Sequence, residues 1–142
     1  MKIDEIINDS IKVKTKLLDP EFITNLEKVC EICVDGLKSG KKILAAGNGG
    51  SSSQASHFIG ELLGRFEKER SALPAICLSS DLTNLTAISN DYGYDQVFSK
   101  QVEGLGNEGD IFFGLTTSGN SKNIINALKK AKEKGMTTII LN

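Results

Sequence analysis

Residues 116–121 form a short hydroxyl-rich segment, TTSGNS, between an apolar run and an amphipathic one. This position predicts a turn that opens a helix. Unpaired backbone N–H groups and the positive end of the helix dipole would stabilise a phosphate there, and the hydroxyls of Thr116, Ser118 and Ser121 could each donate to it. The segment has no lysine, so it suits a phosphate that is held rather than transferred. An ordinary N-cap with a polar turn explains the same residues equally well.

The second group that could do chemistry is the pair His57 and Glu61. Because they are four residues apart on a predicted helix, they share one face. A histidine and a glutamate so placed can be two ligands of a metal ion, or a base and the group that orients it. A surface ion pair is the plainer interpretation. His57 is the only histidine in the sequence, however, and its helix follows a glycine-rich turn, which favours a functional role.

Two further polar loops lie near these groups. The segment GNGGSSS, residues 47–53, would expose backbone amides, but a serine stands where the dinucleotide-binding fingerprint GxGxxG needs its third glycine. No acidic residue ends the next predicted strand, so the sequence supports nicotinamide binding only weakly. The other loop contains Asn90 and Asp91 before Gly93, and these residue types are common in turns of every kind.

The elements that must position these loops alternate along the chain. We expect strands at 42–47, 75–80, 110–116 and 137–142, all buried on both faces, and helices at 52–66, 82–90, 95–105 and 121–134. Such alternation predicts a parallel sheet with helices on both faces, a flavodoxin-like three-layer αβα fold. Ligands of such sheets gather at the carboxyl ends of the strands, where the three polar loops lie. Before the sheet, two amphipathic helices are expected at 3–18 and 20–37, the second capped by Asp19.

Composition limits the function classes. The chain has 142 residues, a net charge of −1 and no tryptophan, so one domain is expected and neither nucleic acid nor a membrane surface is indicated as a partner. No apolar stretch reaches the roughly 20 residues that span a bilayer, and the amphipathic, acidic start differs from a signal peptide. We therefore expect a cytoplasmic protein.

The three cysteines, Cys30, Cys33 and Cys77, do not form an obvious disulfide framework. The segment CEIC has the spacing of a metal half-site or a redox pair. Both of its cysteines fall on the apolar stripe of the second helix, however, and a second cysteine pair is absent from the sequence. We therefore expect Cys30 and Cys33 to be packed as small hydrophobic residues in the core.

Three longer segments together resemble one family. They are GNGGSSSQASHFIGELLGRF (47–66), AISNDYGYDQVFSKQVEGLGNEGD (87–110) and TTSGNSKNIINALKKAKEKGM (116–136). In order and spacing they are similar to the sugar isomerase (SIS) superfamily and, within it, to the phosphoheptose isomerases. The likeness runs from about Val13 to Asn142. It implies a single SIS domain over 1–142, with the N-terminal helices at 1–40 and the αβα core at 41–142.

The resemblance also implies an activity and its residues. The reaction would convert D-sedoheptulose 7-phosphate to D-glycero-D-manno-heptose 7-phosphate through an enediol, an early step towards the ADP- or GDP-heptose of bacterial surface polysaccharides. Glu61 would be the acid/base and would also contact substrate, while His57 and Glu61 would bind one zinc ion per subunit. A homotetramer is also implied. The residues that would contact the phosphorylated seven-carbon sugar are Asn48, Gly49, Gly50, Asn90, Asp91, Thr116, Thr117, Ser118 and Ser121.

One departure from the family pattern affects the metal site. Family members continue past the last strand with a C-terminal helix, whose glutamine and histidine complete the metal site and supply a second acid/base. The present sequence ends at MTTIILN, so we expect half of the metal site to be missing from it. The sequence would then be either a fragment of a longer protein, which the terminal strand favours, or a natural truncation.

Two other functions remain open at this stage. Some relatives of the family are non-catalytic SIS modules that bind a phosphosugar or a protein, including an adaptor of a replication initiator that lacks the acidic residue. The presence of Glu61 beside His57 favours the enzyme over the adaptor. A sugar-phosphate-sensing regulator is the third alternative, but no DNA-binding segment accompanies the domain in this sequence.

Overall fold

The computed structural model describes residues 2–142 and contains two compact units. The first ends at Val34, and the second comprises Asp35–Asn142. The sequence predicted one domain with two N-terminal helices, and the boundary between the units falls inside the second of these helices. The second unit carries every residue expected to bind substrate or metal.

The N-terminal helices are α1 (Ile3–Lys16) and α2 (Pro20–Lys38). The predicted cap is confirmed, because the carboxylate of Asp19 accepts hydrogen bonds from the N–H groups of Glu21 and Phe22 at 3.0 and 3.1 Å. The expected core packing of the cysteines is wrong: neither helix has a buried residue, Cys30 is exposed and Cys33 is half-buried. Most side chains of the apolar stripe that carries them are exposed, among them Phe22, Leu26 and Val34.

Four short strands form a parallel sheet in the order β2-β1-β3-β4. Their bounds are β1 (Ile43–Gly47), β2 (Ala75–Cys77), β3 (Ile111–Leu115) and β4 (Thr137–Leu141). After β1 the next strand, β2, is added on one side of the sheet. After β3 the next strand, β4, is added on the opposite side. The order therefore reverses between β1 and β3, the position at which open parallel sheets bind ligands.

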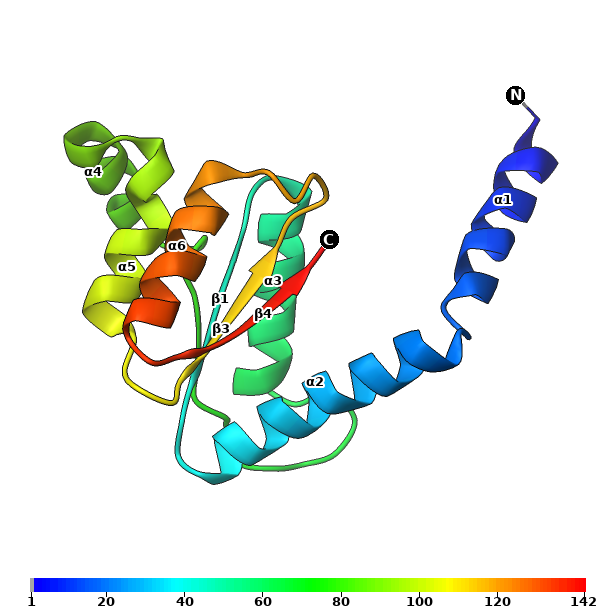
Figure 1. The fold of residues 1–142 in the computed structure, drawn as a ribbon, viewed down its shortest axis with the longest axis horizontal. Coiled ribbons are helices and arrows are strands. Elements are labelled where there is room, and N and C mark those ends of the chain that lie inside the picture. The colour runs from blue at the N-terminus through cyan, green and yellow to red at the C-terminus, as the bar shows by residue number, and fades with distance from the viewer. Residues whose placement is uncertain (1) are drawn as a thin grey trace. The chain divides into compact units, whose positions relative to one another are not determined.

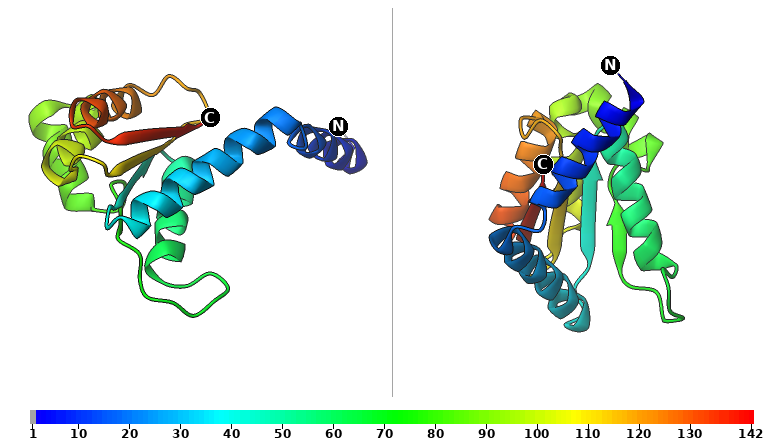
Figure 2. Two further views of the ribbon diagram at one scale, coloured as in Figure 1. Left: turned by 60° about the horizontal axis from the view of Figure 1, so that its bottom comes forward. Right: turned by 90° about the vertical axis from the view of Figure 1, so that its right-hand side faces the viewer.

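Helices cover the two faces of this sheet. Helix α3 (Gly50–Leu63) lies against one face, and α5 (Val97–Leu105) and α6 (Lys122–Glu133) lie side by side against the other (Figures 1 and 2). The connection from β2 to β3 also contains α4 (Leu82–Tyr92) and the short helix η1 (Tyr94–Gln96). The predicted α/β fold with helices on both faces is confirmed.

The main core lies between the sheet and the α5–α6 layer. Leu44 and Phe112 from the central strands pack there with Phe98 and Val102 of α5 and with Ala127 of α6. The expectation that every strand is buried on both faces is correct for β1 and wrong for the two edge strands, because only Ala75 is buried in β2 and only Ile139 in β4. β4 is an edge strand, and its outer residues Ile140 and Leu141 are 38% and 45% exposed.

A buried ion pair closes the opposite end of the sheet from the polar loops. Asp110, which precedes β3, is 2% exposed and pairs with the ammonium of Lys42, which precedes β1. Its carboxylate also accepts the N–H groups of Lys42 and Asn107 at 3.0 and 2.9 Å. Burial by itself would raise the pKa of Asp110, but these hydrogen bonds and the charge of Lys42 outweigh it and hold that pKa below its usual value.

Within residues 2–142, none of the helices combines the length and the apolar character that crossing a lipid bilayer requires.

Candidate functional site

The glycine-rich and hydroxyl-rich loops are neighbours because their strands are paired. Gly47, the last residue of β1, is in register with Leu115, the last residue of β3. The loops that follow, which begin at Asn48 and Thr116, therefore leave the sheet side by side at the point where the strand order reverses. Each loop leads directly into a helix, so two helix N-termini and their free N–H groups meet at one edge of the sheet.

The first loop depends on a close backbone approach at Gly47. A Cβ at this position would overlap the backbone carbonyl of Ser51, so only glycine lets α3 begin so close to the strand. The hydroxyl of Ser79, which follows β2, donates to the carbonyl of Gly47 at 2.8 Å and accepts its N–H at 3.0 Å. These contacts hold the loop rigidly before Asn48, Gly49 and Gly50.

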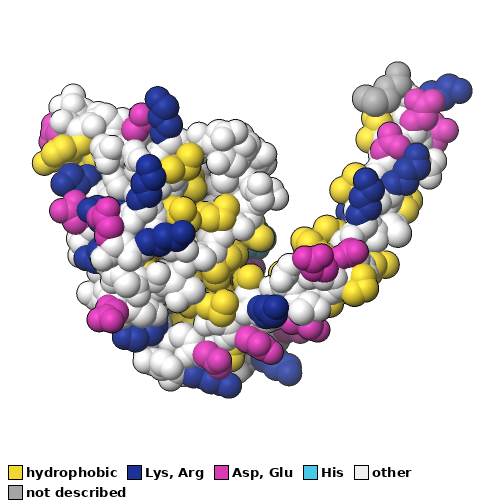
Figure 3. Space-filling view, viewed as in Figure 1, with side chains coloured by type: hydrophobic (Ala, Val, Ile, Leu, Met, Phe, Trp, Pro, Cys, Tyr) yellow, Lys and Arg dark blue, Asp and Glu magenta, His cyan; other side chains and the backbone are white. Residues whose placement is uncertain are grey.

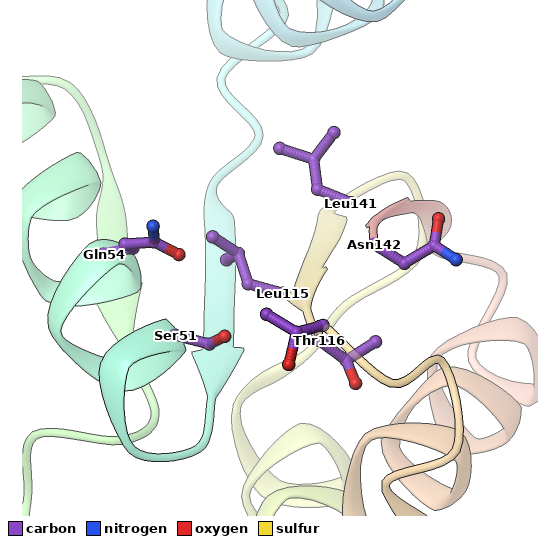
Figure 4. Close-up of a pocket in the computed structure, with 7 residues that line it drawn as sticks. Ser51, Gln54, Leu115, Thr116, Leu141 and Asn142 are labelled. Atoms are coloured by element: carbon purple, nitrogen blue, oxygen red, sulfur yellow. The ribbon is translucent and has the colours of Figure 1, made fainter. Parts of the chain in front are cut away.

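A cavity of about 250 Å³ opens between the start of α3 and the ends of β3 and β4 (Figure 4). Two of the predicted substrate residues, Thr116 and Thr117, line it. The other residues of its wall are Ser51, Gln54, Leu115, Leu141 and Asn142. Polar side chains from α3 thus face the strand ends across the cavity.

Three hydroxyl groups converge beside this cavity. Thr116 is 6% exposed, and its Oγ1 lies 3.2 Å from Oγ of Ser121 and 3.5 Å from Oγ of Ser118. The turn is tied to the neighbouring strand, because the N–H of Thr116 donates to the carbonyl of Leu141 at 2.9 Å. Ser121 is the N-cap of α6, yet its side chain makes no capping hydrogen bond. Its hydroxyl contacts only that of Thr116 and keeps capacity for a ligand, which the simple N-cap interpretation does not explain.

Backbone donors surround the same position. Among residues 2–142, the N–H groups of Thr117, Ser118 and Lys122 have no backbone partner. Unpaired N–H groups at a helix start stabilise an anion, and hydroxyls of the kind found here complete its hydrogen bonds. The arrangement suits a phosphate monoester.

We predict that Ser121→Ala weakens the binding of inorganic phosphate to the full-length protein by about tenfold, because one hydrogen bond to a charged group is lost. Calorimetric titration measures this. Ser10→Ala, at an exposed position of α1, is the matched control and should bind phosphate as the wild type does. Equal phosphate affinity in the Ser121 variant and the wild type would remove the loop from its assigned role.

His57 and Glu61 lie on one face of α3, as the sequence predicts. His57 Nε2 and Glu61 Oε1 are 3.0 Å apart, with the side chains 78% and 35% exposed. Gln54, which lines the cavity, is one turn before His57 on the same face of the helix. A stripe of three polar side chains, Gln54, His57 and Glu61, therefore runs from the cavity along α3.

The last turn of α3 is held by Arg70. Its guanidinium donates to the backbone carbonyl of Glu61 itself and to that of Leu62, the latter at 2.9 Å. A cation at a helix C-terminus satisfies free carbonyls and opposes the negative end of the dipole. Arg70 therefore fixes the backbone from which the Glu61 side chain projects.

The donors for zinc are incomplete within residues 2–142. His57 and Glu61 have the side-chain types that zinc accepts, but a catalytic zinc site has three protein ligands. In this part of the chain no cluster of three or more histidine, cysteine, aspartate or glutamate side chains could hold a metal. Within residues 2–142, His57 and Glu61 alone therefore do not complete a catalytic zinc site.

The third predicted group, Asn90 and Asp91, is not joined to these loops. Both residues are exposed at the end of α4, and their one mutual contact is a hydrogen bond from Asn90 Nδ2 to Asp91 Oδ1 at 3.0 Å. Instead, the hydroxyl of Tyr94 from the same segment reaches the first loop and donates to Asn48 Oδ1 at 2.8 Å. The contact of Asn90 and Asp91 with substrate stays a prediction.

Several residues of the site were missed by sequence reasoning. Ser51 and Gln54 immediately follow the glycines, and their polar character beside a predicted ligand loop was the available signal. Asn123 was detectable in another way, because it lies on the buried stripe of α6 with Ala127 and Ala131, where a polar residue needs a partner. Tyr94 gave no such signal, since its contact spans 46 residues of sequence.

Comparison with known proteins assigns the chain to a family. The profile of the SIS domain family matches residues 8–142. The phosphoheptose isomerase of Sulfurimonas denitrificans is 49% identical over 140 residues, which cover 98% of the chain and 72% of that relative. The chain belongs to the phosphoheptose isomerase family of SIS domains. The family member of Aliarcobacter butzleri is 56% identical over 114 residues, covering 80% of the chain and 60% of that protein.

Solved structures of the family share the fold. The structure of a phosphoheptose isomerase from Francisella tularensis matches with a TM-score of 0.91 at 41% identity, over 98% of this chain and 72% of that one. A phosphoheptose isomerase from Neisseria gonorrhoeae matches with a TM-score of 0.86, also at 41% identity. The chain spans about 60–72% of the length of these family members.

Proposed function

We propose that the protein interconverts D-sedoheptulose 7-phosphate and D-glycero-D-manno-heptose 7-phosphate, as a step towards activated heptoses. The observation that carries this proposal is the position of Glu61 relative to the hydroxyl loop. Gln54 lines the cavity beside Thr116 and Thr117, and Glu61 follows seven residues later on the same face of α3, roughly 10 Å along the helix axis. A phosphate held at the loop would allow an extended sugar chain to reach towards Glu61.

The chemistry needs one base that acts at two adjacent carbons. The carboxylate of Glu61 removes a proton from C1 of the ketose, and the electron pair of the broken C–H bond forms the enediol double bond between C1 and C2. Return of the proton to C2, with movement of a hydroxyl proton from O1 to O2, leaves the carbonyl at C1 and gives the aldose. The phosphate takes no part in bond changes, but its binding energy holds C1 and C2 in register with the carboxylate.

We further propose that His57 and Glu61 supply two ligands of a zinc ion, whose charge would stabilise the oxyanion of the enediolate when bound. Their 3.0 Å separation supports this role. Metal analysis of the purified full-length protein tests it. Zinc should be present in the wild type and should fall to background in His57→Ala, whereas unchanged zinc content would place the metal elsewhere.

We also propose a homotetramer in the cytoplasm. The N-terminal helices support self-association, because apolar side chains run exposed along them (Figure 3), including Ile3, Ile7, Ile11, Leu18, Phe22 and Leu26. Free cysteines suit a reducing compartment. Light scattering should give four times the mass of one chain for the wild type, and Leu26→Glu should lower that mass. A wild type with the mass of one chain would contradict the proposed tetramer.

Cell fractionation tests the proposed location in the cytoplasm.

The direct test of the function is conversion of substrate. Full-length protein incubated with D-sedoheptulose 7-phosphate should produce an aldose, visible as a new anomeric-proton signal in the NMR spectrum. A non-catalytic phosphosugar-binding module would bind the ketose and leave its spectrum unchanged. That second outcome would overturn the proposal while keeping the binding site.

A further inference from the structure

Two asparagine side chains join the candidate loops by a reciprocal pair of hydrogen bonds. Asn48 Nδ2 donates to Asn123 Oδ1 at 2.9 Å, and Asn123 Nδ2 donates back to Asn48 Oδ1 at 2.9 Å. Asn48 directly follows β1, whereas Asn123 is in the first turn of α6, just after the hydroxyl loop. The pair therefore spans the point at which the strand order reverses.

The orientation of this amide pair is determined by its surroundings. Asn123 is 3% exposed, and its Oδ1 also accepts the N–H of Ile124 at 3.0 Å. Because that N–H can only donate, the oxygen must face it, and the Nδ2 group is then left to face Asn48. Asn48 Oδ1 accepts a second hydrogen bond, from the hydroxyl of Tyr94. A flipped Asn48 would place two donors against each other.

Asn48 needs this support because of the backbone around it. Glycines flank it on both sides, and Gly49 adopts a φ of 53° that other residues rarely take. A loop of this composition has many conformations available in the absence of side-chain contacts. The two partners of Asn48 belong to different elements, η1 and α6, so they hold the loop to the rest of the site.

We propose that Asn123 is a positioning residue that acts through Asn48. It holds the glycine-rich loop at a fixed separation from the hydroxyl loop, so that a phosphosugar meets both loops already arranged, and Tyr94 assists it. This inference rests on the proposed function in one respect only, namely that the ligand of the two loops is a phosphosugar. Asn123 itself is buried and does not touch that ligand. A preformed site binds more tightly because less ordering accompanies binding.

The test is a double-mutant cycle on binding. All variants are made in full-length protein that also carries Glu61→Gln, so that no turnover occurs, and calorimetry measures the affinity for D-sedoheptulose 7-phosphate. Asn123→Ala should weaken binding by about tenfold, the effect of one or two side-chain hydrogen bonds. In a background that carries Asn48→Ala, the same change should weaken binding by less than about twofold, because the residue through which it acts is gone.

Two further variants separate positioning from general stability. Asn126→Ala is the control on the same helix. Asn126 makes one side-chain hydrogen bond, from its Nδ2 to the carbonyl of Asp95 at 2.9 Å, and does not contact Asn48; this variant should bind as the parent does. Tyr94→Phe keeps its ring and is at an exposed position, so folding should be preserved. We expect Tyr94→Phe to weaken binding by at least about twofold when Asn48 is present. In protein that also carries Asn48→Ala, it should have no effect on binding.

The outcomes are distinct from those of the function test. Equal losses in the presence and absence of Asn48 would show that Asn123 does not act through it and would overturn the inference, as would full affinity in Asn123→Ala. Absence of isomerase activity in the wild type would overturn the proposed function alone, since the cycle measures binding in an inactive background. A protein with no affinity for the phosphosugar would overturn both.

Discussion

Replacement of Glu61 by Gln should lower kcat for the isomerisation by about 10²- to 10⁴-fold, the range over which a positioned general base contributes. Glutamine has the same shape and can keep a hydrogen bond with His57, but it cannot take a proton from carbon. The affinity for the phosphosugar should change little, because the proposed phosphate position is at the other end of the stripe on α3. Steady-state kinetics and calorimetry on the full-length protein measure the two effects separately.

The control for this variant is Glu103→Gln. Glu103 is an exposed glutamate of α5 that pairs with Lys100 at 3.0 Å, so its replacement makes the same chemical change away from the site. Its turnover should match that of the wild type. Undiminished turnover in the Glu61 variant would remove this residue from the mechanism.

Replacement of Asp110 by Asn should lower the free energy of unfolding by about 3 kcal/mol, because a buried ion pair loses one partner. The carboxylate of Asp110 accepts three hydrogen bonds, whereas an amide cannot accept all three and brings N–H donors of its own. Thermal unfolding of the full-length protein measures the loss. The variant should retain its affinity for phosphate, because Asp110 lies at the end of the sheet away from the loops.

The effect of Asp110 depends on pH in a defined direction. Its pKa is lower in the folded protein than in the unfolded chain, so the ion pair stabilises the fold above the unfolded pKa of about 4. That stabilisation is lost as the pH falls through the pKa that Asp110 has in the folded protein. The difference in stability between wild type and Asp110→Asn should therefore be constant near neutral pH and shrink below about pH 4.

Asp9→Asn is the matched control for this prediction. Asp9 pairs with Lys12 at 3.0 Å, but both side chains are more than two-thirds exposed, and exposed pairs of this kind stabilise proteins little. Its replacement should leave the melting temperature nearly unchanged. A melting temperature equally unchanged in Asp110→Asn would show that the buried pair does not hold β1 and β3 together.

The fold was predictable because its signals are local. Apolar runs such as residues 110–116 predicted strands, and the cap at Asp19 placed the start of α2 correctly. The alternation of strands and helices then allowed few topologies, and the carboxyl ends of the strands followed as the ligand edge. The closeness of His57 and Glu61 likewise followed from helical periodicity alone.

Burial was less predictable because it depends on what covers an element. An apolar run looks the same in a central strand and in an edge strand, so the exposure of Ile140 and Leu141 in β4 could not be foreseen. For the same reason, the apolar stripe that contains Cys30 was assigned to the core. The contact between Asn48 and Asn123 spans 75 residues of sequence and depends on strand order, which the residue pattern does not state.

The central claim is that the hydroxyl loop holds the phosphate while the carboxylate of Glu61 acts at the other end of the sugar. A crystal structure of full-length Glu61→Gln protein with D-sedoheptulose 7-phosphate tests it most directly. The account predicts that the phosphate accepts hydrogen bonds from the hydroxyls of Ser118 and Ser121, with C1 and C2 beside residue 61. A phosphate bound elsewhere, with both serine hydroxyls turned towards protein atoms, would contradict it.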